Sequence, residues 1–264
     1  MRSAHAWLVV SSALALAPTS AFGQQPVRLE LASPVSPCAG VRCSRHGECV
    51  SEDTQAYCFC DEGYRAEELR CVPVSRAPRR SASTVEGAHI VEVALGERGR
   101  DLAGVGAGRL DAPGPLSRWV SGVLWCSDFV SWVYRVAGVP FSGGYGDGAG
   151  WQLTSNTTIR RWYERHHAWV DRSSADEGGA EWSTFRPRPG DYVRIQSPTW
   201  GHSGIVRYVE GDTLHTVEGN ASGRVIATHY AHYRTHERID GFGMTTMADA
   251  RIAATRDHED DITR

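Results

Sequence analysis

One cysteine of this 264-residue chain stands apart from the other six. Cys126 lies in the stretch VLWCSDFVSW, whereas the others lie between residues 38 and 71. The segment after it, residues 127–137, repeats apolar residues every three or four positions and ends at Gly138, which predicts a helix. A helix N-terminus offers partial positive charge and free N–H groups, both of which stabilise a thiolate. Cys126 is therefore a candidate nucleophile.

A nucleophilic thiol needs a base, and the base needs a group that orients it. The stretch GHSGIV places His202 on an expected strand, and TVEGN places Glu218 and Asn220 on the next strand. Of the two partners we favour Glu218, because a carboxylate stabilises an imidazolium more than a neutral amide does. Taken alone, a free cysteine is more often a small buried hydrophobe and a strand histidine is more often structural. The combination favours a catalytic site.

The register of the two strands decides whether His202 can meet its partner. Side chains alternate between the faces of a strand, so a shift of one residue would send Glu218 to the opposite face. We expect an odd-length turn, or a bulge between residues 209 and 217, rather than a plain two-residue turn. This register sets Gly204 opposite Glu218 and His202 opposite Asn220.

The N-terminus predicts export. A single early arginine is followed by an apolar and small-residue run and by Ala21-Phe22-Gly23, which predicts a secretory signal peptide over residues 1–23. We expect no membrane span and a mature protein in the periplasm or outside the cell. The net charge of −3 and the pI near 6.4 argue against a nucleic-acid partner.

The other six cysteines predict a small disulfide-rich module. Their spacing is C-x4-C-x5-C-x8-C-x-C-x10-C. A segment of this size cannot bury enough apolar surface by itself, so in an exported chain the six cysteines predict three disulfides. Their spacing leaves all 15 pairings open. A zinc site fits less well, because the usual two pairs of closely spaced ligands are missing.

Composition divides the rest of the chain. Residues 72–84 are rich in proline, arginine and serine and predict a linker, across which we expect few contacts. Residues 85–245 are globular in composition, and residues 246–264 form a charged tail. Helical periods at residues 88–95, 127–137 and 155–166 precede strand patterns at residues 186–195, 201–209 and 213–219. Helices followed by an antiparallel sheet make an α+β fold.

The second half of the small module resembles an EGF-like domain. The resemblance rests on CFCDEGYRAEELRC, which supplies Cys58, Cys60, Gly63, Tyr64 and Cys71. It implies one pairing of the cysteines. The pairs are Cys38 with Cys49, Cys43 with Cys58, and Cys60 with Cys71.

The large domain resembles the CHAP family, the cysteine- and histidine-dependent amidohydrolases and peptidases of the NlpC/P60-like group with a papain-like fold. The landmarks are WCSDFVSWVYRVAGVPF, PRPGDYV, GHSGIV and TVEGN, within residues 85–245. The resemblance implies Cys126 as nucleophile, His202 as base, Glu218 as the third residue and Asn220 as a nearby amide. Ser203 departs from the family, which commonly has a hydrophobic residue there. The implied substrate is a peptidoglycan peptide, with no metal or organic cofactor.

Two other patterns could carry chemistry. His229, His232 and His236 would share a face if their segment were helical and could then bind a metal, but no carboxylate or thiolate completes such a site. The glycine-rich stretch GGYGDGAG lacks the lysine that follows in a phosphate-binding loop. We interpret this stretch as a mobile loop beside the active site.

Two classes of function remain open from the sequence. The first is a secreted thiol-dependent amidase or peptidase that acts on cell wall, with the EGF-like module as a spacer or tether. The second is a non-catalytic adhesion protein that binds an unidentified ligand through that module. The set of Cys126, His202 and Glu218 favours the first. We expect a monomer, and the acyl acceptor is either water or an amine.

The thiol hypothesis predicts the behaviour of Cys126. An activated Cys126 should react with iodoacetamide at neutral pH in the unreduced, folded protein. The substitution Cys126→Ala should abolish hydrolysis and leave the thermal transition nearly unchanged. A Cys126 that is alkylated only after denaturation would belong to the buried structural cysteines instead.

Overall fold

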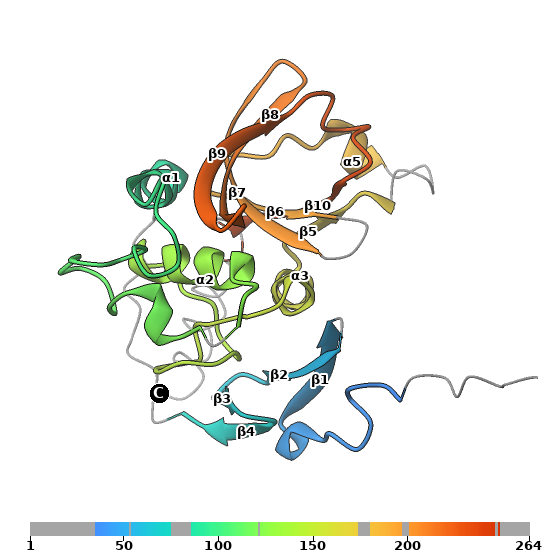
Figure 1. The fold of residues 1–264 in the computed structure, drawn as a ribbon. Helices are drawn as coiled ribbons and strands as arrows, with labels where there is room; N and C mark the ends of the chain where they lie inside the picture. The colour runs from blue at the N-terminus through green and yellow to red at the C-terminus, as the bar shows by residue number, and fades with distance from the viewer. Residues whose placement is uncertain are drawn as a thin grey trace, which may run out of the picture. The chain divides into compact units, whose positions relative to one another are not determined.

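The computed structural model describes residues 35–52, 54–74, 86–120, 122–173, 180–196, 201–245 and 248 (Figure 1). The expected signal peptide, most of the expected linker and nearly all of the charged tail lie outside these residues. The described part has the expected α+β composition, with antiparallel sheets. It contains no helix that is long and apolar enough to cross a membrane.

A six-stranded antiparallel sheet forms the C-terminal half of the described chain. Its strand order is β5-β10-β6-β7-β8-β9. The strands are β5 (Trp169–Asp171), β6 (Tyr192–Ile195), β7 (His202–Glu210), β8 (Thr213–Ala221), β9 (Arg224–Tyr230) and β10 (Ile239–Gly243). The expected strand over residues 186–195 is thus confined to its last four residues, and β5, β9 and β10 were not expected.

The three predicted helices are all present. They are α1 (Gly87–Gly96), α2 (Cys126–Val136) and α3 (Asn156–Arg165). A short helix, α5 (Ala180–Thr184), and two 3-10 turns, Cys43–Arg45 and Leu116–Arg118, complete the helical elements of the described residues. Ser155 caps α3 by accepting a hydrogen bond from the Thr158 N–H, and the Thr158 side chain bonds back to the Ser155 backbone.

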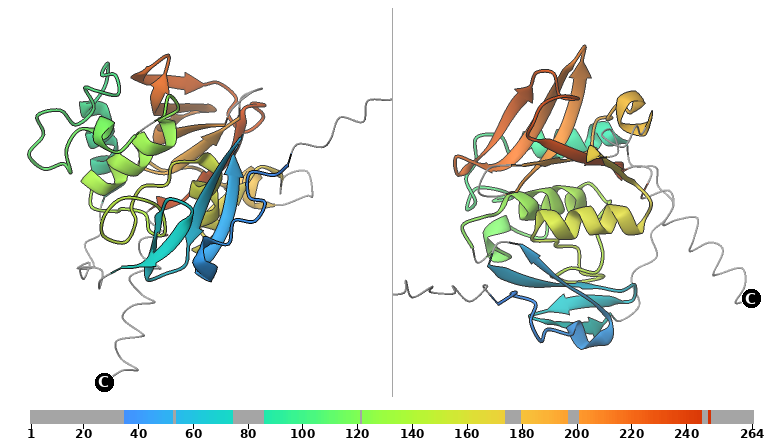
Figure 2. Two further views of the ribbon diagram at one scale, coloured as in Figure 1. Left: turned by 60° about the horizontal axis from the view of Figure 1, so that its bottom comes forward. Right: turned by 90° about the vertical axis from the view of Figure 1, so that its right-hand side faces the viewer.

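The central helix α2 is buried on all sides. Every residue from Cys126 to Tyr134 is buried, as a helix enclosed between layers requires. Figures 1 and 2 show α2 and α3 between the six-stranded sheet and the strands β1 to β4. The start of α2 is therefore held from several directions, which fixes the position of Cys126.

The disulfide-rich module, residues 35–74, consists of two small hairpins. The first pairs β1 (Gly47–Glu52) with β2 (Gln55–Cys60), and the second pairs β3 (Tyr64–Glu67) with β4 (Arg70–Pro73). The three disulfides are those that the EGF-like resemblance implies: Cys38–Cys49, Cys43–Cys58 and Cys60–Cys71.

The module shares a hydrophobic core with the large domain. Val50 and Phe59 are buried in the same cluster as the apolar faces of α2 and α3. The guanidinium carbon of Arg165, on α3, lies 3.9 Å from the centroid of the Phe59 ring. The same side chain donates from Nη1 to the carbonyl oxygen of Cys60 over 2.7 Å. The expectation of few contacts between the two parts is wrong.

The glycine-rich loop is part of this contact. The backbone N–H of Cys60 donates to the Gly143 carbonyl over 2.8 Å, and that of Ala66 donates to the Gly144 carbonyl over 2.6 Å. Gly143 has a φ of +79°, and a Cβ atom there would lie 2.5 Å from the Cys60 oxygen. Glycine is needed for this approach. The loop packs against the disulfide-rich module, so the interpretation as a mobile loop beside the active site is wrong.

The shared core predicts coupled unfolding. Phe59 is 1% exposed, so Phe59→Ala should lower the free energy of unfolding by about 3 kcal/mol. All tryptophans of the chain lie outside residues 35–74, so tryptophan fluorescence reports on the large domain. We expect Phe59→Ala to lower the urea midpoint of the tryptophan transition.

Leu69 supplies the control, because it lies in the same module and is 42% exposed. Leu69→Ala should leave the midpoint nearly unchanged. A tryptophan transition that is identical in Phe59→Ala and wild type would mean that the module unfolds independently.

Candidate active site

Cys126 is the first residue of α2 and has no disulfide partner. Its side chain lines a pocket although the residue is only 7% exposed. The residue before it, Trp125, makes no side-chain cap to the helix, and its carbonyl accepts the first helical bond from the Phe129 N–H over 2.9 Å. The N–H groups of the first turn are therefore directed at the same region as the sulfur.

The register of β7 and β8 brings Glu218 to the pocket face. Gly204 pairs with Glu218, as expected from the sequence. The turn is the two-residue Gly211-Asp212 connection, and the register shifts between Val206 and Tyr208. The extra residue is thus Arg207, on β7, so the expected location of the bulge between residues 209 and 217 is wrong. The bulge still has the expected effect, because it places Glu218 on the same face of the sheet as His202. With a two-residue turn and no extra residue, Glu218 would lie on the opposite face.

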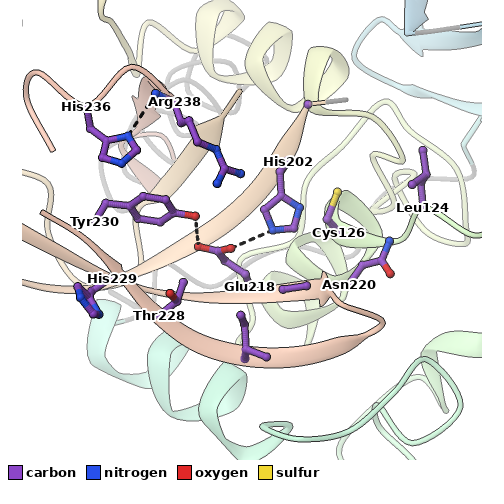
Figure 3. Close-up of a pocket in the computed structure, with 13 residues that line it drawn as sticks. Leu124, Cys126, His202, Glu218, Asn220, Thr228, His229, Tyr230, His236 and Arg238 are labelled. Atoms are coloured by element: carbon purple, nitrogen blue, oxygen red, sulfur yellow. Dashed lines mark hydrogen bonds and ion pairs between the residues drawn. The ribbon is translucent and has the colours of Figure 1, made fainter. Parts of the chain in front are cut away.

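His202 lies between Cys126 and Glu218 (Figure 3). Its Nε2 atom is 3.0 Å from Oε2 of Glu218. The other ring nitrogen, Nδ1, is therefore the one available to the Cys126 thiol. Burial lowers the pKa of His202, but its interactions with Cys126 and with the Glu218 carboxylate outweigh burial and raise the pKa to about 9. The charged imidazolium is therefore the favoured form at neutral pH.

Glu218 is buried, and both of its carboxylate oxygens are hydrogen-bonded. Its Oε1 atom accepts from the Thr216 hydroxyl over 2.6 Å and from the Tyr230 hydroxyl over 2.9 Å. Burial raises the pKa of Glu218, but the hydrogen bond and charge of His202 and the two hydroxyl donors together lower it below its ordinary value. The site therefore holds a carboxylate against the imidazolium.

Asn220 occupies a different position from the one expected. The β7–β8 pairs begin at Gly204 and Glu218, as expected, but the expected pair of His202 with Asn220 is not part of the ladder. Asn220 has a φ of +60°, and its Nδ2 atom donates to the carbonyl of Val123 over 3.0 Å. Asn220 thus lines the pocket and holds the segment that leads into α2.

The pocket has a volume of about 560 Å³ and a basic wall opposite the thiol. Arg238 and His236 line this wall, and Figure 3 shows the Arg238 guanidinium directed into the pocket. The Nε atom of Arg238 donates to the Gln196 carbonyl over 3.0 Å, which fixes the plane of the head group. No ion pair of Arg238 is found among the described residues.

The three histidines of the sequence pattern do not share a helical face. His229 lies on β9, His232 contacts Asp212 through Nδ1 over 2.8 Å, and His236 accepts from the Arg238 N–H. Within the described ranges, the one group of three potential metal ligands is Cys43, Cys58 and Cys71. These sulfurs belong to disulfides.

The sequence did not identify Thr216, Tyr230 or Arg238. Thr216 could have been found, because it precedes Glu218 by two positions on a strand and so shares its face. Tyr230 and Arg238 come from β9 and the segment before β10, whose placement depends on pairings that the local pattern does not specify.

Comparison with known proteins supports the resemblance. The family model of the CHAP domain matches residues 118–220, a segment that contains Cys126, His202, Glu218 and Asn220. Among curated proteins, no sequence matches this chain.

Two similar solved structures are the crystal structure of Ly7917 and that of Ly7917 with the hydrolyzing product of MDP. They have 17% and 16% sequence identity and TM-scores of 0.36 and 0.34. Each match covers 61% of this chain and 63% of the other. The chain thus spans less than two thirds of the length of the structures that it matches.

The geometry predicts a specific effect of Glu218→Gln. Because the Glu218 charge raises the pKa of His202, the substitution should move that pKa from about 9 toward the ordinary value of 6.5. NMR titration of the His202 imidazole measures this directly. The folded-state pKa lies above the ordinary one, so the ionic pair stabilises the fold fully below pH 6.5 and progressively less as pH rises through about 9.

Asn220→Ala is the matched comparison, since Asn220 lines the same pocket without contacting His202. We expect it to leave the pKa of His202 near the wild-type value and to reduce turnover less than Glu218→Gln does. If Asn220→Ala shifted the titration more than Glu218→Gln, the amide rather than the carboxylate would be the orienting group.

Proposed function

We propose that the protein is a secreted, thiol-dependent amidase or endopeptidase that hydrolyses amide bonds in peptidoglycan peptides. The observation that carries this proposal is that Cys126, His202 and Glu218 line one pocket at the start of a buried helix, with His202 hydrogen-bonded to Glu218. The CHAP match over residues 118–220 supports the same reaction class. The disulfides and the expected signal peptide support action outside the cytoplasm.

In the first step, the Cys126 thiolate attacks the carbonyl carbon of the amide and forms a C–S bond. The carbonyl electron pair moves onto oxygen, and N–H groups at the start of α2, including that of Cys126, stabilise the oxyanion. The imidazolium of His202 then donates its proton to the leaving nitrogen, and the C–N bond breaks. The raised pKa of His202, about 9, keeps this proton available at neutral pH.

In the second step, neutral His202 takes a proton from water as the water oxygen attacks the thioester carbon. The C–S bond breaks, the product leaves as a carboxylic acid, and the proton returns to the Cys126–His202 pair. Glu218 acts throughout on the imidazole, because its carboxylate holds Nε2 and thereby keeps Nδ1 directed at the sulfur.

The basic wall of the pocket supports an anionic peptide as substrate. Arg238 carries a permanent positive charge, and the carboxylate of Glu218 is already engaged by His202, Thr216 and Tyr230. A substrate carboxylate near the scissile amide would meet the Arg238 guanidinium, which suits carboxylates through paired N–H donors. Peptides with free carboxylates therefore fit this pocket better than neutral peptides.

The proposal is tested by mass analysis of purified peptidoglycan after incubation with the mature protein. We expect new fragments that carry a free amine and a free carboxylate at one amide bond, and we expect none with Cys126→Ala. A wild-type protein that releases no fragment from walls of several peptide compositions, although Cys126 is alkylated in the folded state, would favour the non-catalytic adhesion function.

A further inference from the structure

Four buried polar side chains form a cluster behind the active site. Ser127, Asn156, Tyr192 and Ser203 are each at most 3% exposed. The Ser127 and Ser203 hydroxyl oxygens are 3.1 Å apart, and the Tyr192 and Ser203 oxygens are also 3.1 Å apart. The Ser203 hydroxyl donates to the Asn156 side-chain oxygen. The Ser127 and Tyr192 hydroxyls lie within hydrogen-bond distance of both that oxygen and the Ser203 oxygen. We call this set the Asn156 cluster.

The Asn156 cluster joins the two elements that carry the reacting groups. Ser127 follows Cys126 on α2, and Ser203 follows His202 on β7. Neighbouring strand residues face opposite sides of the sheet, so His202 faces the pocket while Ser203 faces the helices. A hydrogen bond between the two serines therefore sets the distance between the start of α2 and the strand of His202.

Glu52, the last residue of β1 in the disulfide-rich module, fixes the orientation of Asn156. Its Oε1 atom accepts from Asn156 Nδ2 over 2.8 Å, and its Oε2 atom accepts from the Thr157 N–H over 2.9 Å. An ionised carboxylate only accepts hydrogen bonds, so it requires the NH₂ side of the amide. The amide oxygen must then point inward, where the three hydroxyls need an acceptor.

Glu52 also lies beside the residue that precedes His202. A Cβ atom on Gly201 would lie 2.7 Å from Asn156 Nδ2 and 3.3 Å from Glu52 Oε1. Gly201 itself lines the pocket. The Glu52–Asn156 pair thus packs directly against the backbone that enters β7 at the active site.

We infer that Glu52 is a positioning residue for Cys126 and His202, so that the disulfide-rich module completes the active site instead of serving as a separate tether. The inference rests on the proposed function. Without Glu52, the Asn156 amide is free to turn and present NH₂ donors to hydroxyls, which disrupts a buried network. The start of α2 and the strand of His202 are then no longer linked by an ordered Asn156 cluster, so Cys126 and His202 can shift relative to each other. Small displacements of reacting groups reduce rates strongly.

The test compares Glu52→Ala, Glu52→Gln and a control in the same strand, Glu48→Ala. Glu48 is exposed on β1, so its removal keeps the module and changes the net charge equally. Two rates are measured on the full mature chain: alkylation of Cys126 by iodoacetamide in the folded state, and hydrolysis of a soluble wall peptide, resolved into kcat and KM. Thermal transitions are recorded for each variant.

For Glu52→Ala we expect the alkylation rate and kcat to fall about tenfold each, with KM changed less than twofold. Glu52→Gln should be intermediate, because its carbonyl can accept one of the two hydrogen bonds. Glu48→Ala should match wild type in all three quantities. A lowered thermal transition for Glu52→Ala with an alkylation rate and kcat at wild-type values would overturn the inference, because Glu52 would then only dock the module.

The alkylation rate needs no substrate, which separates this inference from the proposed function. If wild type hydrolyses no wall peptide but loses alkylation rate on Glu52→Ala, the proposed function is wrong and the positioning role stands. If wild type hydrolyses the peptide and Glu52→Ala does so at the same kcat, the positioning role is wrong and the proposed function stands.

Discussion

The structure depends on keeping a charged imidazole in a mostly buried place. Burial alone lowers the pKa of a histidine. In this site, the interactions of His202 with the Cys126 side chain and the Glu218 carboxylate outweigh burial and raise the pKa of His202 to about 9. The three groups come from α2, β7 and β8, so their contact is a tertiary requirement.

Several features of the fold follow from this one constraint. The bulge at Arg207 returns Glu218 to the pocket face after a two-residue turn, and Thr216 and Tyr230 occupy the carboxylate oxygen that His202 leaves free. On the other side of β7, the Asn156 cluster links the residues that follow Cys126 and His202. The disulfide-rich module reaches this cluster through Glu52, and it shares the core that encloses α2.

Helical periodicity and strand alternation in the sequence predicted the parts of the site that depend on neighbouring residues in the chain. The helical period placed Cys126 at a helix start, and strand alternation with TVEGN placed Glu218 on the face of His202. The location of the bulge and the contact of Asn220 with Val123 were missed, since both depend on the neighbouring strand and loop. The docking of the disulfide-rich module was missed because Glu52 and Asn156 are about a hundred positions apart, and no periodicity links residues at that separation.

In the proposed mechanism, the Cys126 sulfur carries the acyl group of the substrate. The most direct measurement is the intact mass of the mature protein, quenched with acid during turnover of an activated acyl ester, followed by peptide mapping. Activated esters acylate faster than the thioester is hydrolysed, so the intermediate should accumulate. We predict one added acyl group, located on Cys126 and absent in Cys126→Ala. Continued turnover with no acyl group on Cys126, or with the group on another residue, would contradict it.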